Sequence, residues 1–210
     1  NSFIENGAAS HAVTSAMSAL YISANVELLS TITADIVDSF GASVGSPSIG
    51  MDGLIFSDLS QVAEGVFGTS DQKIRVANWS SNNTWTLSLA ATDGSSALWD
   101  SGGGDYYDYN DHSGEIDGSD FDSFGGQLTI DPSIGVLSPS FGCSDDSGIS
   151  KGSENSFDQE LSISSISLLI AGSLAPYNCA WDFTGVSVNQ KVPSRQLPGT
   201  YGLDLMLTIL

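Results

Sequence analysis

The stretch from Leu20 to Val37 constrains the fold of this chain more than any other. Its even-numbered positions are apolar with one exception, a serine, whereas its odd-numbered positions are mostly polar. The even-numbered residues are Leu20, Ile22, Ala24, Val26, Leu28, Ser30, Ile32, Ala34 and Ile36. Alternation with a period of two predicts a β-strand that has one face on a core and the other in water.

The alternation is about three times as long as a usual strand, and this length leaves three interpretations open. One strand could bend and serve both sheets of a sandwich. A hairpin could turn near Ser30-Thr31, although no glycine or proline marks a turn there. Alternatively, part of the strand could extend beyond its own domain and pair with a neighbouring copy of the chain.

The remainder of the chain consists of shorter alternating segments that are separated by turn-forming residues. Because no long helical pattern accompanies them, these segments predict an all-β fold, an antiparallel β-sandwich of the jelly-roll or immunoglobulin-like kind. We expect residues 1–19 to form an extended N-terminal arm. Residues 20–210 are expected to form one sandwich domain, with an acidic loop inserted at residues 100–126.

The charge balance is strongly acidic. Five lysines and arginines stand against 25 aspartates and glutamates, which gives a formal net charge of −20. Nucleic acids and anionic membrane surfaces would be repelled, whereas divalent cations would be attracted. No stretch approaches the ~20 apolar residues of a transmembrane helix, so we expect no membrane span.

Cys143 and Cys179 are the two cysteines of the chain, and they predict one disulfide. Two buried free thiols are the alternative. Charged residues make up only 14% of the chain, and a surface rich in Ser, Thr, Gly and Asn is typical of extracellular β-proteins. The polar residues after Asn1 do not form a signal peptide, as expected of a mature chain. We therefore expect a secreted protein, extracellular or on the cell surface.

Two segments resemble a known family. Trp85-Thr86-Leu87 is a Trp-x-Leu motif within the run NNTWTLSLAATD, and PGTYGLDLMLTIL closes the chain. Together they resemble the WxL-type domains of bacterial cell-surface proteins, and residues 74–210 also resemble uncharacterised secreted β-proteins. The resemblance implies attachment to the cell wall, with cell-wall polysaccharide as a partner. The closing strand departs from the family pattern because it contains no tryptophan.

A Gly- and Ser-rich acidic segment is the strongest local signal for a ligand. Its oxygen-bearing side chains are Asp105, Asp108, Asn110, Asp111, Glu115, Asp117, Asp120 and Asp122. Calcium requires six to eight oxygen ligands on a turning backbone, so these residues are candidate calcium ligands, although their spacing is not that of an EF-hand. A solvated acidic loop is the alternative. Three tyrosines, Tyr106, Tyr107 and Tyr109, could instead form an exposed aromatic patch for sugar or protein contact.

The sequence favours a non-enzymatic role. It contains no G-x-S-x-G elbow, no H-E-x-x-H motif and no Cys–His pair, and nothing selects two of its 25 acidic residues as a catalytic pair. Asn78-Trp-Ser and Asn82-Asn-Thr match the glycosylation sequon, which makes Asn78 and Asn82 candidate glycosylation sites.

We therefore expect a secreted structural subunit of a pilus-like or sheath-like filament, a homopolymer that assembles by strand donation between subunits. The residues of the expected assembly strand are Leu20, Ile22, Val26, Leu28, Ile32 and Ile36. Head-to-tail contacts that do not close into a ring build a fibre. The alternative is a monomeric WxL-like module that binds the cell wall or a glycan, and the mass of the native species would separate the two.

Overall fold

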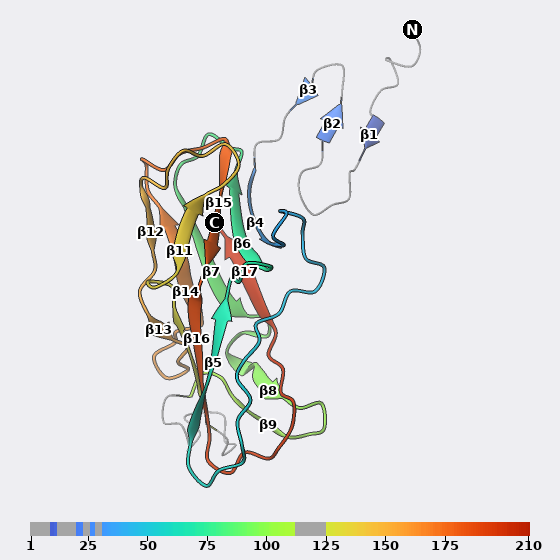
Figure 1. The fold of residues 1–210 in the computed structure, drawn as a ribbon, viewed down its shortest axis with the longest axis vertical. Helices are drawn as coiled ribbons and strands as arrows, with labels where there is room; N and C mark the ends of the chain where they lie inside the picture. Colours follow the sequence, from blue (N-terminus) through green and yellow to red (C-terminus); the bar gives the residue numbers. More distant parts are fainter. Residues whose placement is uncertain (1–8, 12–19, 23–25, 28–30, 112–124) are drawn as a thin grey trace.

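The computed structural model describes residues 9–11, 20–22, 26–27, 31–111 and 125–210, with side chains described from residue 31 onwards. Within these residues the protein is built from antiparallel strands, and one 3-10 turn (η1, Gly94–Ser96) is the only helical element. None of the described helices could span a membrane. Four-stranded sheets pack against each other in an antiparallel β-sandwich, which confirms the predicted fold class (Figure 1).

One layer is a long sheet whose strands bend in the middle. Its lower half has the order β13-β10-β16-β5 and its upper half the order β11-β15-β6-β4. The lower strands are Asn155–Ser156, Gln127–Asp131, Val186–Val192 and Gln61–Phe67. The upper strands are Val136–Pro139, Cys179–Thr184, Lys73–Asn78 and Ile32–Val37. Strands β15 and β16 follow one another directly, so the two halves form a continuous, elongated layer (Figure 1).

The bend between the two halves depends on two glycines. Gly185 separates β15 from β16 with a φ of 75°, and its N–H donates to the carbonyl of Gly68, which follows β5. Gly68 also has a positive φ, 81°, and a Cβ at this position would lie 2.7 Å from the carbonyl oxygen of Phe183. Residues with a side chain are disfavoured in this conformation, and here there is no space for one either.

We expect Gly68→Ala to lower the free energy of unfolding by about 2 kcal/mol, because the substitution combines a disfavoured φ with a backbone clash. Urea denaturation measures the change. Gly45→Ala is the matched control, since a Cβ there meets nothing within 4 Å. Equal stability of the two variants would show that the bend tolerates a side chain.

The second layer has the order β12-β14-β7-β17. Its strands are Ile149–Lys151, Ser165–Ala171, Trp85–Ala91 and Leu205–Ile209. Strand β7 is central and alternates strictly between buried and half-buried side chains, as its sequence predicts. Trp85 and Leu87 of the Trp-x-Leu motif are both buried. In this fold the motif therefore contributes to the core.

The core lies between the two layers. Trp181 of β15 is fully buried, and its ring lies 6.0 Å from that of Trp85 across the sandwich. A short hairpin, β8 (Leu98–Asp100) with β9 (Tyr106–Asp108), adds to the side of the sandwich. Cys143 is bonded to Cys179 at the start of β15, which confirms the predicted disulfide.

Of the three interpretations of the stretch from Leu20 to Ile36, a single bent strand is wrong, because the described parts of the stretch belong to separate strands. Leu20–Ile22 (β2) pairs with Val26–Glu27 (β3) in antiparallel fashion, so the chain reverses between Ile22 and Val26. Strand β2 also pairs with Ala9–His11 (β1), and the three form a small sheet of their own (Figure 1). The polarity pattern does not distinguish these separate strands from one long strand, because the same alternation runs through all of them. Residues 23–25 and 28–30 lie outside the described residues.

The sandwich itself begins later than the predicted boundary at residue 20. Ile32 and Ile36, which the sequence assigned to the assembly strand, belong to β4 and pair with β6 of their own chain. Leu28 lies outside the described residues. Only Leu20, Ile22 and Val26 of the predicted set are placed in the separate N-terminal sheet.

Candidate functional site

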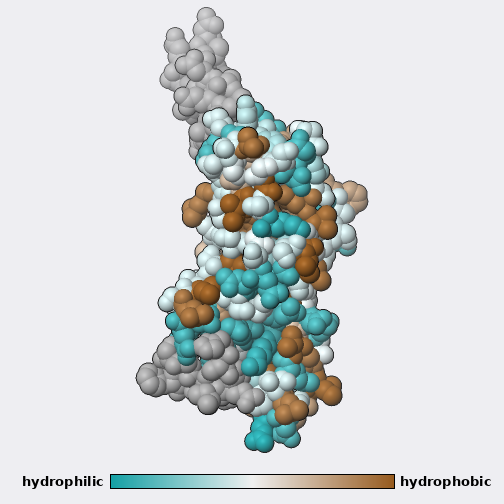
Figure 2. Space-filling view, turned by 90° about the vertical axis from the view of Figure 1, so that its left-hand side faces the viewer, coloured by the Kyte–Doolittle hydropathy of each residue, from teal (hydrophilic) through white to brown (hydrophobic). Residues whose placement is uncertain are grey.

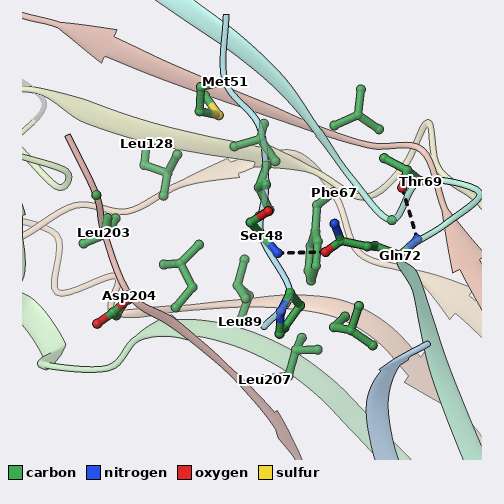
Figure 3. A pocket seen from close by; sticks show the side chains of 18 of the residues that line it. Ser48, Met51, Phe67, Thr69, Gln72, Leu89, Leu128, Leu203, Asp204 and Leu207 are labelled. Carbon is green, nitrogen blue, oxygen red and sulfur yellow. Dashed lines mark hydrogen bonds between the residues drawn. The ribbon is translucent and has the colours of Figure 1, made fainter. Parts of the chain in front are cut away.

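A groove opens along one side of the sandwich, where three edge strands meet. Strands β4, β5 and β17 each stand last in their sheets, and the cavity between them has a volume of about 530 Å³. Side chains from the core, including those of Leu89, Leu128 and Val188, line this cavity (Figure 3). The two layers are therefore not sealed along this side.

The outer edge of β17 is unpaired among the described strands, although β4 lies close to it. Strand β17 pairs with β7 along one side, and no described strand pairs with its other side. Leu205 and Leu207 of β17 line the groove (Figure 3). An additional strand placed here would gain main-chain hydrogen bonds and bury alternate side chains in the groove.

The edge of β5 is partly covered by the segment that precedes it. Met51 forms a bridge with Gly65, and the N–H of Asp52 donates to the carbonyl of Glu64. Farther along, the N–H of Ser48 donates to Oε1 of Gln72 at 2.7 Å (Figure 3). This segment forms a wall of the groove, whose other borders are the edge strands β4 and β17.

A second hollow adjoins the groove and is lined by aromatic rings. It has a volume of about 580 Å³, and Trp99 and Tyr201 line both cavities. The ring of Trp99 stacks on that of Tyr107 with centroids 6.1 Å apart and planes 13° apart. Tyr201 meets the ring of Tyr107 edge-on at 5.2 Å. We call this cavity the aromatic hollow.

Amide side chains fix these rings in place. Trp99 Nε1 donates to Oε1 of the buried Gln190 at 2.8 Å. The hydroxyl of Tyr201 donates to the carbonyl of Leu197 and accepts from Nε2 of Gln196. The other amide atom, Gln196 Oε1, is buried and has no hydrogen-bond partner within the described part of the chain. Gln196 thus holds the Tyr201 ring and is itself among the residues that line the hollow.

No local motif marks this site, because Tyr201 lies far along the chain from the β8–β9 hairpin that carries Trp99 and Tyr107. The exposed tyrosine patch that the sequence suggested is wrong for two of its three members. Tyr107 and Tyr109 are buried, and burial raises the pKa of both phenols, that of Tyr109 to about 12. Tyr106 is 39% exposed. Alternation along β9 turns Tyr107 inward and Tyr106 outward.

The acidic segment is partly buried. Asp108, Asn110 and Asp111 are each at most 3% exposed, and Asp105 is half-buried. Asp158 is also buried, and the neighbouring Gln159 N–H donates to the carbonyl of Asn110. A wholly solvated loop is therefore wrong for the first part of this segment. The remaining candidates, Glu115, Asp117, Asp120 and Asp122, lie outside the described residues.

No group of three His, Cys, Asp or Glu side chains among the described residues is placed to hold a metal ion. Calcium binding by this segment stays a prediction. Its ligands would have to combine Asp105, Asp108, Asn110 and Asp111 with acidic residues beyond Asp111.

The two sequons differ in accessibility. Asn78 is fully buried, its Nδ2 donates to the carbonyl of Asn82, and its Oδ1 accepts from Ser80. A glycan on Asn78 would require these bonds to break, and glycosylation of Asn78 stays a prediction. Asn82 is exposed, and its glycosylation stays a prediction.

Comparisons with protein-family models, with curated proteins and with solved structures found no match. The resemblance to WxL-type domains therefore rests on the two segments from which it was drawn.

Proposed function

We propose that this protein is a secreted, non-enzymatic structural subunit of a cell-surface filament, in which the N-terminal segment of one copy occupies the lateral groove of the next. The observation that carries the proposal is the groove itself, which reaches core side chains and is bordered by the unpaired edge of β17. A donated strand would complete the second layer and close the core. The disulfide suits an oxidising, extracellular setting.

The composition of the N-terminal segment suits a strand that is donated to a neighbouring copy. Residues 6–26 contain no Asp, Glu, Lys or Arg, although the whole chain carries 25 acidic residues. A neutral segment avoids the repulsion that two copies of charge −20 would otherwise experience at the contact. Leu20, Ile22 and Val26 alternate with polar residues and could fill the groove with one face.

Donation of the N-terminal strands would break only short strand pairings within their own chain. Strands β1 and β2 pair over three residues, and β2 and β3 pair over two. Sheets of such short strands are marginally stable on their own. Pairing along β17, which has five residues, would replace these contacts with a longer ladder and add apolar burial.

Apolar side chains at the two ends of the sandwich favour a head-to-tail arrangement. Leu174 and Tyr177 are exposed at the end where β15 begins, and Ile55, Leu59 and Leu197 are exposed at the end where β16 finishes. Because β15 and β16 are consecutive, these are opposite ends. Figure 2 shows further apolar patches spaced along the length of one face. A contact between two different ends builds an open filament when the rotation between copies does not close into a ring.

Deletion of residues 1–30 tests the proposal. We expect the full chain to form filaments in negative-stain electron microscopy and high-mass species in gel filtration, whereas the deletion variant elutes as a monomer. A synthetic peptide of residues 9–28 should bind the deletion variant and raise its melting temperature, because it supplies the missing strand. A parallel sample with a calcium chelator tests whether calcium contributes to assembly.

Two substitutions locate the contact. Leu207→Arg places a charge in the groove and should abolish binding of the peptide. Val136→Arg, on an exposed position of the edge strand β11, is the matched control and should leave peptide binding unchanged. Monodisperse single particles of the full chain, with no binding of the peptide, would contradict the proposal.

The alternative, a monomeric cell-wall or glycan-binding module, is favoured by one observation, the aromatic hollow. A native mass near 21.8 kDa for the full chain would support this alternative.

A further inference from the structure

We infer that the aromatic hollow is a binding site for a neutral saccharide. The inference does not rest on the proposed assembly, because the rings and amides that form the hollow belong to a single sandwich. It assigns a ligand class, neutral saccharides, to a site formed chiefly by Trp99, Tyr201 and Gln196. No sequence motif includes these residues.

The aromatic rings are held in the manner that sugar stacking requires. A pyranose presents its C–H face to an aromatic ring, and a rigid ring loses little entropy when the sugar binds. Trp99 is fixed by the stacked ring of Tyr107 and by the hydrogen bond from Nε1 to Gln190. It remains half-buried and lines the hollow together with Tyr201. The Trp99 ring is thus pre-oriented for a ligand.

The polar groups of the hollow suit hydroxyls. Gln196 lines the hollow, and its side-chain amide is a neutral polar group of the kind that pairs with sugar hydroxyls. Gln61, Ser57 and Thr200 add further neutral donors and acceptors to the lining. The lining also contains apolar side chains such as Leu54, Ile55 and Phe56, so the hollow combines apolar surface with a few polar groups, as small-molecule sites do.

The charges indicate a neutral ligand. Among the described residues that line the hollow, Asp52 is the only charged one, in a chain with 25 acidic residues. An anionic saccharide would meet both Asp52 and the net charge of −20, and no cation in the lining would compensate it. The volume of about 580 Å³ lies within the range of small-molecule sites.

Titration of the full chain with a panel of neutral tetrasaccharides tests the inference. The probes are chitotetraose, cellotetraose, maltotetraose and mannotetraose, with tetragalacturonate as the anionic comparison. We expect at least one neutral probe to bind in isothermal titration calorimetry and to change the tryptophan fluorescence. Tetragalacturonate should not bind. Absence of binding by all four neutral probes would overturn the inference.

Variants assign the binding to the hollow. Trp99→Ala should weaken binding by about tenfold or more, because it removes the stacking surface. Trp79→Ala is the matched control, since Trp79 packs against Phe141 at the far end of the sandwich. Gln196→Met removes the side-chain amide with little change in volume and should weaken binding even if Trp99→Ala fails to fold. Unchanged affinity in the folded variants would overturn the inference.

A competition experiment separates the saccharide from a donated strand, because the groove and the hollow share lining residues. A peptide of residues 9–28 is added to the sugar complex. Binding of both ligands together, or sugar binding that persists when Leu207→Arg blocks the peptide, supports a separate sugar site. Fluorescence changes caused by the peptide alone, with no response to any sugar, would assign the hollow to assembly and overturn the inference.

Discussion

Replacing Cys143 and Cys179 together with alanine is expected to lower the free energy of unfolding by about 3–4 kcal/mol. The two cysteines are 36 residues apart in sequence and are bonded in the structure. Closing a loop of this length restricts the unfolded chain, and that restriction is lost when the bond is absent. Guanidinium denaturation of the oxidised protein and of the double variant measures the difference.

Treatment with a reductant serves as the control for this prediction. Reduced wild-type protein should unfold at nearly the same denaturant concentration as the double alanine variant, and the variant should not respond to reductant. A wild-type protein whose stability is indifferent to reductant would contradict a stabilising role of the disulfide.

Asp182→Ala is expected to lower the free energy of unfolding by about 3 kcal/mol. Asp182 accepts from Arg75 through both carboxylate oxygens, at 2.7 and 3.0 Å, and from Lys73 at 3.1 Å. These side chains are only 13–19% exposed. Removing the carboxylate would leave two cations side by side in a partly desolvated position, which is why the expected loss exceeds that of a surface ion pair.

The contribution of Asp182 should depend on pH. Burial alone would raise the pKa of this carboxyl, but hydrogen bonds from Arg75 and Lys73 outweigh burial and hold the pKa below its ordinary value of 3.8. A group with a lowered pKa stabilises the fold above its unfolded pKa and loses that effect as the pH falls through the folded pKa. The difference between wild type and Asp182→Ala should therefore be constant above about pH 5 and shrink below about pH 4.

Asp58→Ala is the matched control for Asp182. Asp58 pairs with Arg195 at 3.0 Å, but both side chains are about three-quarters exposed, at 76% and 74%. Exposed pairs of this kind contribute roughly 0–1 kcal/mol. Thermal unfolding across the pH range should show a large, pH-dependent effect for Asp182 and almost none for Asp58. Equal effects at the two positions would show that burial does not distinguish these pairs.

The sequence predicted the elements that depend on local pattern. Alternation in β7 identified a half-buried strand, and the structure buries Trp85 and Leu87 as that pattern requires. Gly185, with a positive φ, lies at the bend between β15 and β16. Such features follow from a side-chain period of two and from the conformational freedom of glycine, both of which can be recognised from neighbouring residues alone.

The candidate sites were predicted less well, because they depend on contacts between distant residues. The three tyrosines near the acidic segment suggested a surface patch, yet Tyr109 packs against Phe157 with ring centroids 5.1 Å apart and is fully buried. The aromatic hollow joins Trp99, Tyr107 and Tyr201, which no local motif connects. The groove could not be predicted from alternation, since alternation does not show which strand edges remain unpaired.

The sequence by itself determined the all-β class, the disulfide and the acidic charge, because composition, cysteine count and short-range periodicity carry that information. Only the tertiary structure decided that Ile32 and Ile36 belong to the sandwich, that β17 has an unpaired edge, and that two cavities meet beside it. The physical reason is that strand pairing and packing select among many arrangements compatible with the same local pattern. Which arrangement forms depends on contacts between side chains that are far apart in sequence and pack in the same core.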